Sequence, residues 1–114
     1  MIPASPGRTR LALSLSLLSG LALAACAEGP PTAEMGIANN AISRAQDEGA
    51  AELAPDPLKL ATAKLQDAQA AMTKSDNKQA RYLAEQAALD ANYAEASALA
   101  QRAHKTAHET KEIP

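Results

Sequence analysis

The sequence predicts an all-α protein whose main feature is a long antiparallel helical hairpin of coiled-coil character. Ala supplies 29 of the 114 residues, whereas Val, Phe and Trp are absent and Tyr occurs twice. Sheets and α/β enzyme cores need β-branched and aromatic side chains to fill their layers, so this composition argues against both. Apolar residues also recur at steps of three and four, which is the helical period. The length predicts one domain.

Residues 1–25 have the layout of a secretory signal peptide. Arg8 and Arg10 make the start of the chain positive, and a stretch rich in Leu and Ser follows over 11–22. This stretch is too short and too rich in Ser to cross a bilayer, which takes about 20 apolar residues. We therefore expect it to direct export and to be removed, so that the mature chain begins at Cys26.

The end of this segment, Leu23-Ala24-Ala25-Cys26, resembles the lipobox of bacterial lipoproteins. Cys26 is the only Cys, so it has no disulfide partner within the chain, and a free thiol is a liability in an oxidising compartment. We expect a diacylglycerol on its sulfur and a further acyl chain, such as palmitate, on its amine. This lipid is the only bound group we expect. The alternative is a cleaved signal with an incidental Cys, or a weak membrane anchor.

The residue after Cys26 and the net charge bear on location. Gram-negative lipoproteins that stay in the inner membrane usually carry Asp there, and Ala27 instead resembles the outer-membrane default. We expect the inner leaflet of the outer membrane, facing the periplasm. Without residues 1–25, 9 basic and 13 acidic residues remain. This mildly acidic balance predicts no nucleic-acid partner and no electrostatic docking onto anionic lipid.

Residues 26–32 form the lipidated Cys and a tether, because Gly29 and two prolines prevent regular structure. The helical domain then spans 33–110. Its first helix is predicted over about 33–51, with Thr32 as the N-cap. One apolar stripe of this helix comprises Met35, Ala38, Ile42 and Ala45.

A Pro-Asp-Pro break separates this helix from the next. Pro55 and Pro57 each restrict the residue before them. Asp56 and Pro57 fit the N-cap and first position of a second helix over about 57–74. The seam of that helix has coiled-coil spacing and comprises Leu58, Ala61, Leu65, Ala68 and Met72.

The last helix is predicted over about 77–110, after a turn at Ser75-Asp76-Asn77, and it contains neither Pro nor Gly. Its Ala residues keep a heptad rhythm from Ala80 to Ala98. A second rhythm comprises Ala96, Ala100, Ala103 and Ala107.

Helix lengths bear on the topology. The last helix should measure about 50 Å and the second about 27 Å, so the second covers only half of it. The first helix covers the other half if the chain bends at Pro55 and Pro57 and continues along the same partner, and we favour this bent hairpin over a compact bundle. Otherwise the uncovered Ala stripe is a subunit or partner interface.

The order of motifs resembles the family catalogued as domain of unknown function 4398, found in bacterial envelope lipoproteins, over roughly 33–108. The matching pieces are Leu53-Ala54-Pro55, Leu58-Lys59, Ala61, Lys64-Leu65, Ser75-Asp76, Ala80-Arg81, Leu83-Ala84-Glu85-Gln86-Ala87 and Asp90-Ala91. Members often have Tyr-Ala-Pro and Gly-Asp-Tyr at the two turns, where this chain has Leu53 and Ser75-Asp76-Asn77. The resemblance implies location and helical shape, and it brings no established activity.

The sequence offers few groups for chemistry. His104 and His108 lie four apart on one helical face and are weak candidates for a metal, but no free Cys is available and the zinc-protease Glu is missing. We expect two solvated His and no metal site. No nucleophile elbow, paired acid–base cleft or phosphate-binding loop is recognisable, so we predict that the protein is not an enzyme and has no small-molecule substrate.

Two functions of different class remain open. The first is a structural or self-associating envelope lipoprotein, and the second is a binding adaptor for another envelope complex or a peptidoglycan-associated protein. Weak metal binding is a remote third. For Tyr82 and Tyr93, eleven residues apart, we favour rings lying over the Ala seam, and the alternative is a pair of partner contacts. The interface candidates are Ala96, Ala100, Ala103, Ala107, Tyr82 and Tyr93.

Overall fold

The computed structural model describes residue 3 and residues 28–113 of the chain. Helices make up almost all of residues 28–113. Their bounds are α1 Thr32–Asp47, α2 Ala50–Leu53, α3 Pro55–Thr73 and α4 Asn77–Lys111. No strand occurs among the described residues, so the all-α class is confirmed. The predicted bounds of the last helix, about 77–110, also agree closely with α4.

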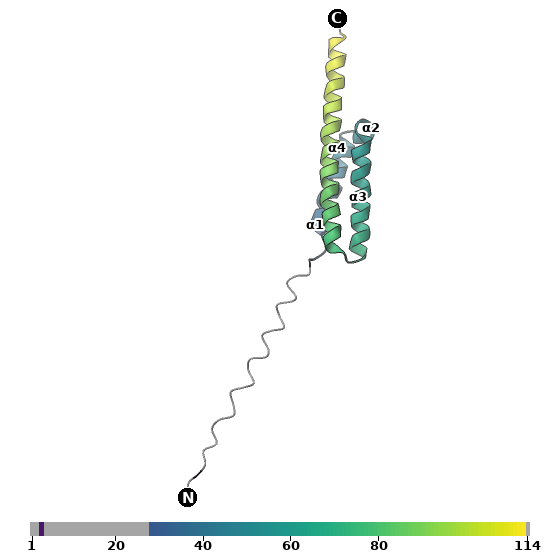
Figure 1. Cartoon of the computed structure of the whole chain (residues 1–114). Helices are drawn as coiled ribbons and strands as arrows, with labels where there is room; N and C mark the ends of the chain where they lie inside the picture. The colour runs from purple at the N-terminus through teal and green to yellow at the C-terminus, as the bar shows by residue number, and fades with distance from the viewer. Residues whose placement is uncertain (1–2, 4–27, 114) are drawn as a thin grey trace.

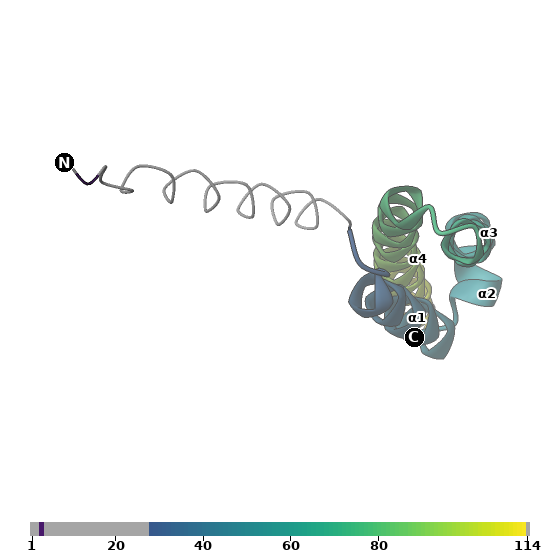
Figure 2. The same ribbon diagram turned by 90° about the horizontal axis from the view of Figure 1, so that it is seen from below.

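The three long helices lie side by side, with α4 packed against both α1 and α3 (Figures 1 and 2). A tight turn joins α3 to α4, so these two helices run antiparallel, which confirms the predicted hairpin. The helices α1 and α4 run parallel, because Glu34 of α1 and Glu48 directly after it contact Arg81 and Arg102 of α4 in the same order. The end of α4 extends beyond both neighbours (Figure 1).

The core between these helices is thin. In the described part of the chain, its buried apolar side chains are fifteen Ala together with Met35, Ile42, Leu58 and Leu65. Leu53 and Leu83 are partly buried and pack at its edge. An Ala methyl removes little apolar area from water, at about 25 cal/mol per Å², but it lets neighbouring backbones approach closely. Close packing along the whole contact therefore replaces a few large side chains as the source of stability.

The break between the first two long helices lies earlier than the sequence analysis predicted. The expected helix over 33–51 ends at Asp47, because Gly49 adopts a left-handed conformation with φ of 82°. The short α2 follows, and α3 begins at Pro55 rather than at Pro57. Pro55 fits the first position of a helix, where its missing N–H is no loss. Asp56 thus lies inside the first turn and is not the N-cap.

The start of α1 also differs from the prediction. Thr32 is the first residue of the helix rather than its N-cap, and the N-cap is Pro31, with no side-chain hydrogen bond. The backbone N–H of Met35 donates to the carbonyl of Pro31 at 3.0 Å. Because Pro31 is buried, the end of the tether is part of the folded domain.

The turn between α3 and α4 matches the prediction from Ser75-Asp76-Asn77. Ser75 has φ of 60°, and its N–H donates to Met72 O at 3.0 Å. The N–H of Asp76 donates to Ala71 O at 3.0 Å, which completes a Schellman arrangement at the end of α3. The Asp76 carboxylate then accepts from the N–H of Gln79 at 3.1 Å and caps α4.

The expected path of the first helix is wrong. We predicted that it would continue along the end of the last helix, but the chain reverses between α1 and α3, and α1 lies beside the same part of α4 that α3 covers (Figure 1). The physical reason lies in α4, because its buried Ala positions end at Ala98. Beyond that point the side facing the bundle carries charged residues such as Lys105 and Glu109. The stripe at 96–107 faces the opposite side.

Candidate interaction surface

Arginine side chains set the register of α1 on α4. Arg81 pairs with Glu34, and Arg44 donates to Asn92 Oδ1 at 3.0 Å and lies 3.3 Å from Glu95. A further contact, between Arg102 and Glu48, lies at the end of α1. Such partly exposed pairs contribute about 0.2–1 kcal/mol each, so they choose between registers of an Ala core more than they stabilise it.

Fewer charges link α3 to α4. Lys64 Nζ lies 2.6 Å from Asp90 Oδ2, and both side chains are about one quarter exposed. The rest of this contact is apolar, with Leu58 and Leu65 set against the Ala positions of α4. The sides of α4 that face α1 and α3 are therefore covered by these two helices along their whole length.

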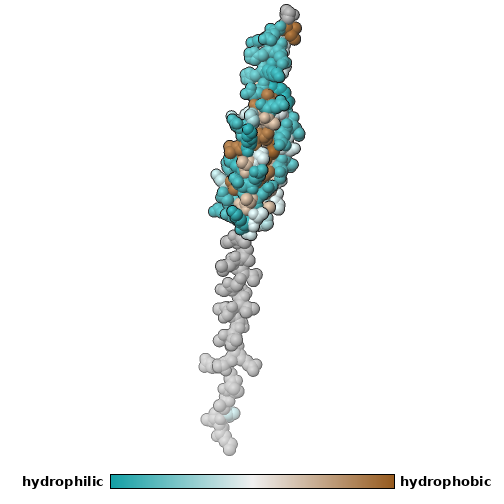
Figure 3. Space-filling model, turned by 90° about the vertical axis from the view of Figure 1, so that its right-hand side faces the viewer, coloured by the Kyte–Doolittle hydropathy of each residue, from teal (hydrophilic) through white to brown (hydrophobic). Residues whose placement is uncertain are grey.

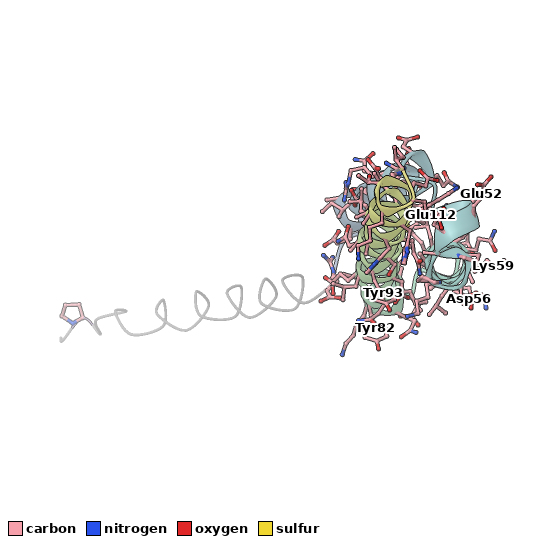
Figure 4. The ribbon with its side chains drawn as sticks, turned by 90° about the horizontal axis from the view of Figure 1, so that it is seen from above. Glu52, Asp56, Lys59, Tyr82, Tyr93 and Glu112 are labelled. Carbon is pink, nitrogen blue, oxygen red and sulfur yellow. The ribbon has the colours of Figure 1, made fainter. Side chains whose placement is uncertain are left out.

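The side of α4 that points away from both neighbours is apolar as well. Tyr82, Leu89 and Tyr93 are 56%, 60% and 67% exposed. Each residue of a helix is turned by about 100° from the last, which places these three about half a turn from the buried Ala positions. Figure 4 shows Tyr82 and Tyr93 on one side of α4. We call this side the outer face, made of Tyr82, Leu89, Tyr93, Ala96, Ala100, Ala103 and Ala107.

The two halves of the outer face carry side chains of different size. Its large side chains, Tyr82, Leu89 and Tyr93, come first, and only Ala residues follow from Ala96 onward. All four of these Ala residues are exposed. Tyr82 and Tyr93 do not lie over the buried Ala seam, so the interpretation that the sequence favoured for these rings is wrong.

A shallow hollow lies between the outer face and α1. It is open to solvent and measures about 250 Å³, and its lining is Glu34, Ile37, Glu85, Ala88 and Leu89. Ile37 of α1 is 60% exposed, so it adds a large apolar side chain to the border of the outer face. The sequence analysis missed Ile37, because it lies on another helix and becomes a neighbour only through packing.

The last turns of α4 stand free of the bundle. Every residue over 101–113 is exposed, and the end of α1 reaches only as far as Arg102. We call residues 103–111 the overhang. On the bundle side seen in Figure 3, apolar side chains lie among hydrophilic ones, whereas the overhang is largely hydrophilic. The apolar part of the overhang is thus confined to Ala103 and Ala107.

The two His residues lie on the overhang. His104 and His108 are exposed, one helical turn apart. Within the described residues, no cluster of three or more His, Cys, Asp or Glu could hold a metal ion. The pair therefore stays a weak candidate with two ligands at most.

The start of the described domain is fastened to the base of α4. Asn77 Nδ2 donates to Glu28 O at 2.8 Å, and Arg81 Nη2 donates to Gly29 O at 3.3 Å. The sequence analysis treated this segment as a tether and predicted no contact between it and Asn77 or Arg81. Backbone carbonyls are the acceptors here, and they leave no signal in a sequence.

The predicted signal peptide and the lipobox with Cys26 lie outside the described residues. None of the helices that are described is long and apolar enough to span a bilayer. Only Ala27 lies between Cys26 and Glu28, so the Cα atoms of Cys26 and Glu28 can be at most about 7 Å apart. If Cys26 carries lipid, the base of the bundle therefore lies at the membrane surface.

Of the comparisons with known proteins, one finds a match, and that match covers the helical domain. No curated protein and no solved structure matches the chain significantly. A family model, described as a domain of unknown function, matches residues 33–110, which include almost all of α1 and α4 and the whole of the bundle core. The chain therefore belongs to the family DUF4398.

Proposed function

We propose that the protein is a lipid-anchored envelope lipoprotein with a structural or protein-interaction role and no catalytic activity. The observation that carries this proposal is the outer face of α4. It is apolar along its length, and neither α1 nor α3 covers it. Exposed apolar surface that continues over several turns of a helix is typical of an interaction site.

The lipid anchor is the second part of the proposal and rests on Leu23-Ala24-Ala25-Cys26. An acylated Cys26 attaches the bundle to the membrane, which we take to be the outer membrane with the domain facing the periplasm. The attachment of Glu28 and Gly29 to α4 supports a bundle held close to the lipid rather than at the end of a long flexible linker.

Two experiments on the full-length chain, expressed in a Gram-negative host, test these parts separately. Metabolic labelling with an alkyne-bearing palmitate should mark the chain and fail to mark the variant Cys26→Ser, which should also leave the membrane fraction. An unlabelled parent chain would refute the anchor.

For the interaction role, a photo-reactive residue is placed at Ala100, with Ala63 on the exposed side of α3 as the matched position. We expect adducts from Ala100 and few from Ala63. Equal yields at both positions would refute the outer face as the interaction site. A second copy in the adduct indicates a structural role, and a different envelope protein indicates an adaptor.

A further inference from the structure

We infer that the partner of the outer face is a second copy of this chain, paired antiparallel along α4 about a point near Ala98. This inference deepens the interaction role proposed above and rests on it. The first support is the spacing of positions on the outer face. The outer-face positions from Leu89 to Ala107, extended by Glu85 and Lys111 on the same side of α4, follow steps of four, four, three, four, three, four and four residues. Tyr82 lies before this series. The series reads the same from either end, so a reversed copy meets it position for position.

The second support is the size of the side chains that this register brings together. Leu89 and Tyr93 each meet an Ala, so no two large side chains collide, and at the centre of the contact Ala meets Ala. The three kinds of pair, each occurring twice, are Leu89 with Ala107, Tyr93 with Ala103, and Ala96 with Ala100. A parallel pair would instead set Tyr93 against Tyr93 and leave a gap along the Ala half.

Charge supports the same register. Glu85 of one copy lies opposite Lys111 of the other, and the pair occurs twice because the interface is two-fold symmetric. In a parallel dimer, Glu85 would face Glu85. Neither Glu85 nor Lys111 forms an ion pair within the described residues, so both are free to make this contact.

The hollow beside the outer face fits the overhang of the second copy. In this register Ala107 of the partner's α4 reaches Leu89, at the border that Ile37 shares. A helix that enters an apolar groove through small residues can sit deep enough to cover both side chains. The pairing thus gives each overhang, which projects beyond its own bundle, an apolar surface to lie on.

The symmetry also agrees with a lipid anchor on each copy. The two-fold axis of an antiparallel pair is perpendicular to both α4 helices, so both copies of α1 lie on one side of the dimer and both copies of α3 on the other. The chain enters each bundle beside α1, through Glu28 and Gly29. Both anchors therefore reach a single membrane when the dimer lies flat on it.

One helix face gives a modest interface beside the roughly 1,600 Å² of a typical stable complex. Attachment to one membrane raises the effective concentration of the two copies, so we expect the dimer on the membrane rather than in dilute solution. The test therefore uses the full-length chain in cells, where Cys26 and its lipid are retained.

Two differently tagged copies are expressed together, one with Leu89→Cys and the other with Ala107→Cys, and thiols are oxidised before a non-reducing gel. We expect a disulfide-linked pair that contains both tags. Cells with only Leu89→Cys should give at least tenfold less dimer, because the two substituted positions lie about 27 Å apart along the antiparallel pair. The parent chain measures any background from Cys26, and peptide mass spectrometry identifies the linked residues.

A matched control replaces Leu89→Cys by Ala70→Cys, which is exposed on α3 and should give no pair with Ala107→Cys. Strong dimer from Leu89→Cys alone would establish a parallel arrangement and overturn the inference. Absence of linkage between Leu89→Cys and Ala107→Cys, in chains present at parental levels, would also overturn it.

Charge reversal gives a readout that does not depend on the new thiols. With the same Cys pair, Glu85→Lys should lower the yield severalfold, and Lys111→Glu in the same chain should restore it. No change with Glu85→Lys, or no restoration, would contradict this register. These outcomes are separate from the proposed function, since Cys26 labelling tests the anchor, and an adduct of Ala100 with another protein leaves an interaction role without the second copy.

Discussion

Arg102 holds the last turn of α1 through two different groups of Glu48. Arg102 Nη1 donates to the Glu48 carboxylate at 2.8 Å, and Nη2 donates to the Glu48 backbone carbonyl at 2.6 Å. Glu48 directly precedes the left-handed Gly49, so the contact fixes α1 against α4 at the point where the chain reverses. It also marks where α4 leaves its neighbours and the overhang begins.

Replacing this arginine tests its role in the fold. We expect Arg102→Ala to lower the free energy of unfolding by about 1 kcal/mol, because both hydrogen bonds are lost from a partly exposed site. Urea unfolding of the mature chain in mild detergent, followed by circular dichroism, measures the change. Lys105→Ala, on the exposed overhang, is the control and should leave the free energy of unfolding almost unchanged. Equal losses in both variants would show that the contact with Glu48 contributes nothing.

Two glycines of the first half of the chain should respond in opposite directions to the same substitution. Gly49→Ala should lower the free energy of unfolding by about 1 kcal/mol, because φ of 82° strains a residue with a Cβ. Gly36→Ala should raise it by about 0.5–1 kcal/mol, since Gly36 lies within α1 and a Cβ there meets no atom within 4 Å. Thermal melts of the two variants beside the parent chain give the signs. A loss of stability with Gly36→Ala would mean that α1 is not helical at this position.

The turn between α3 and α4 offers a stabilising substitution. Ser75 has φ of 60°, which glycine adopts without the cost that a side chain brings. We expect Ser75→Gly to raise the free energy of unfolding by about 0.5 kcal/mol, and Asp76→Ala to lower it by about 1 kcal/mol through loss of the cap on α4. The control is Ser43→Gly within α1, which should be destabilising. A destabilising Ser75→Gly would argue against the Schellman arrangement.

The sequence predicted α4 and the turn that precedes it well, and it predicted the path of α1 poorly. This difference has a physical basis. The bounds of α4 depend on local signals, namely the Asp76 cap and the absence of Pro and Gly. The path of α1 depends on partners such as Arg44 with Asn92, which lie 48 residues apart and leave no local pattern. Gly49 was a usable local signal, because a glycine near the end of a periodic stretch often ends a helix.

The outer face was predicted only in part, for a related reason. Helical spacing alone identified Ala96 to Ala107 and placed the two Tyr on a similar face. Leu89 has the same spacing and could have been added from the sequence. Ile37 could not, since it joins the border of this face only when α1 packs beside α4.

The buried Ala positions of α4 predict how little space separates the helices. Ala91 of α4 is fully buried against the neighbouring helices, so Ala91→Leu must force the backbones apart or move other side chains. We expect a loss of about 1–3 kcal/mol in the free energy of unfolding, measured by urea unfolding. Ala70→Leu, at an exposed position of α3, adds the same side chain without crowding and should change the free energy little. If Ala91→Leu were tolerated as well as Ala70→Leu, the helices would have room for large side chains. The register would then depend on the arginine contacts rather than on close packing of Ala.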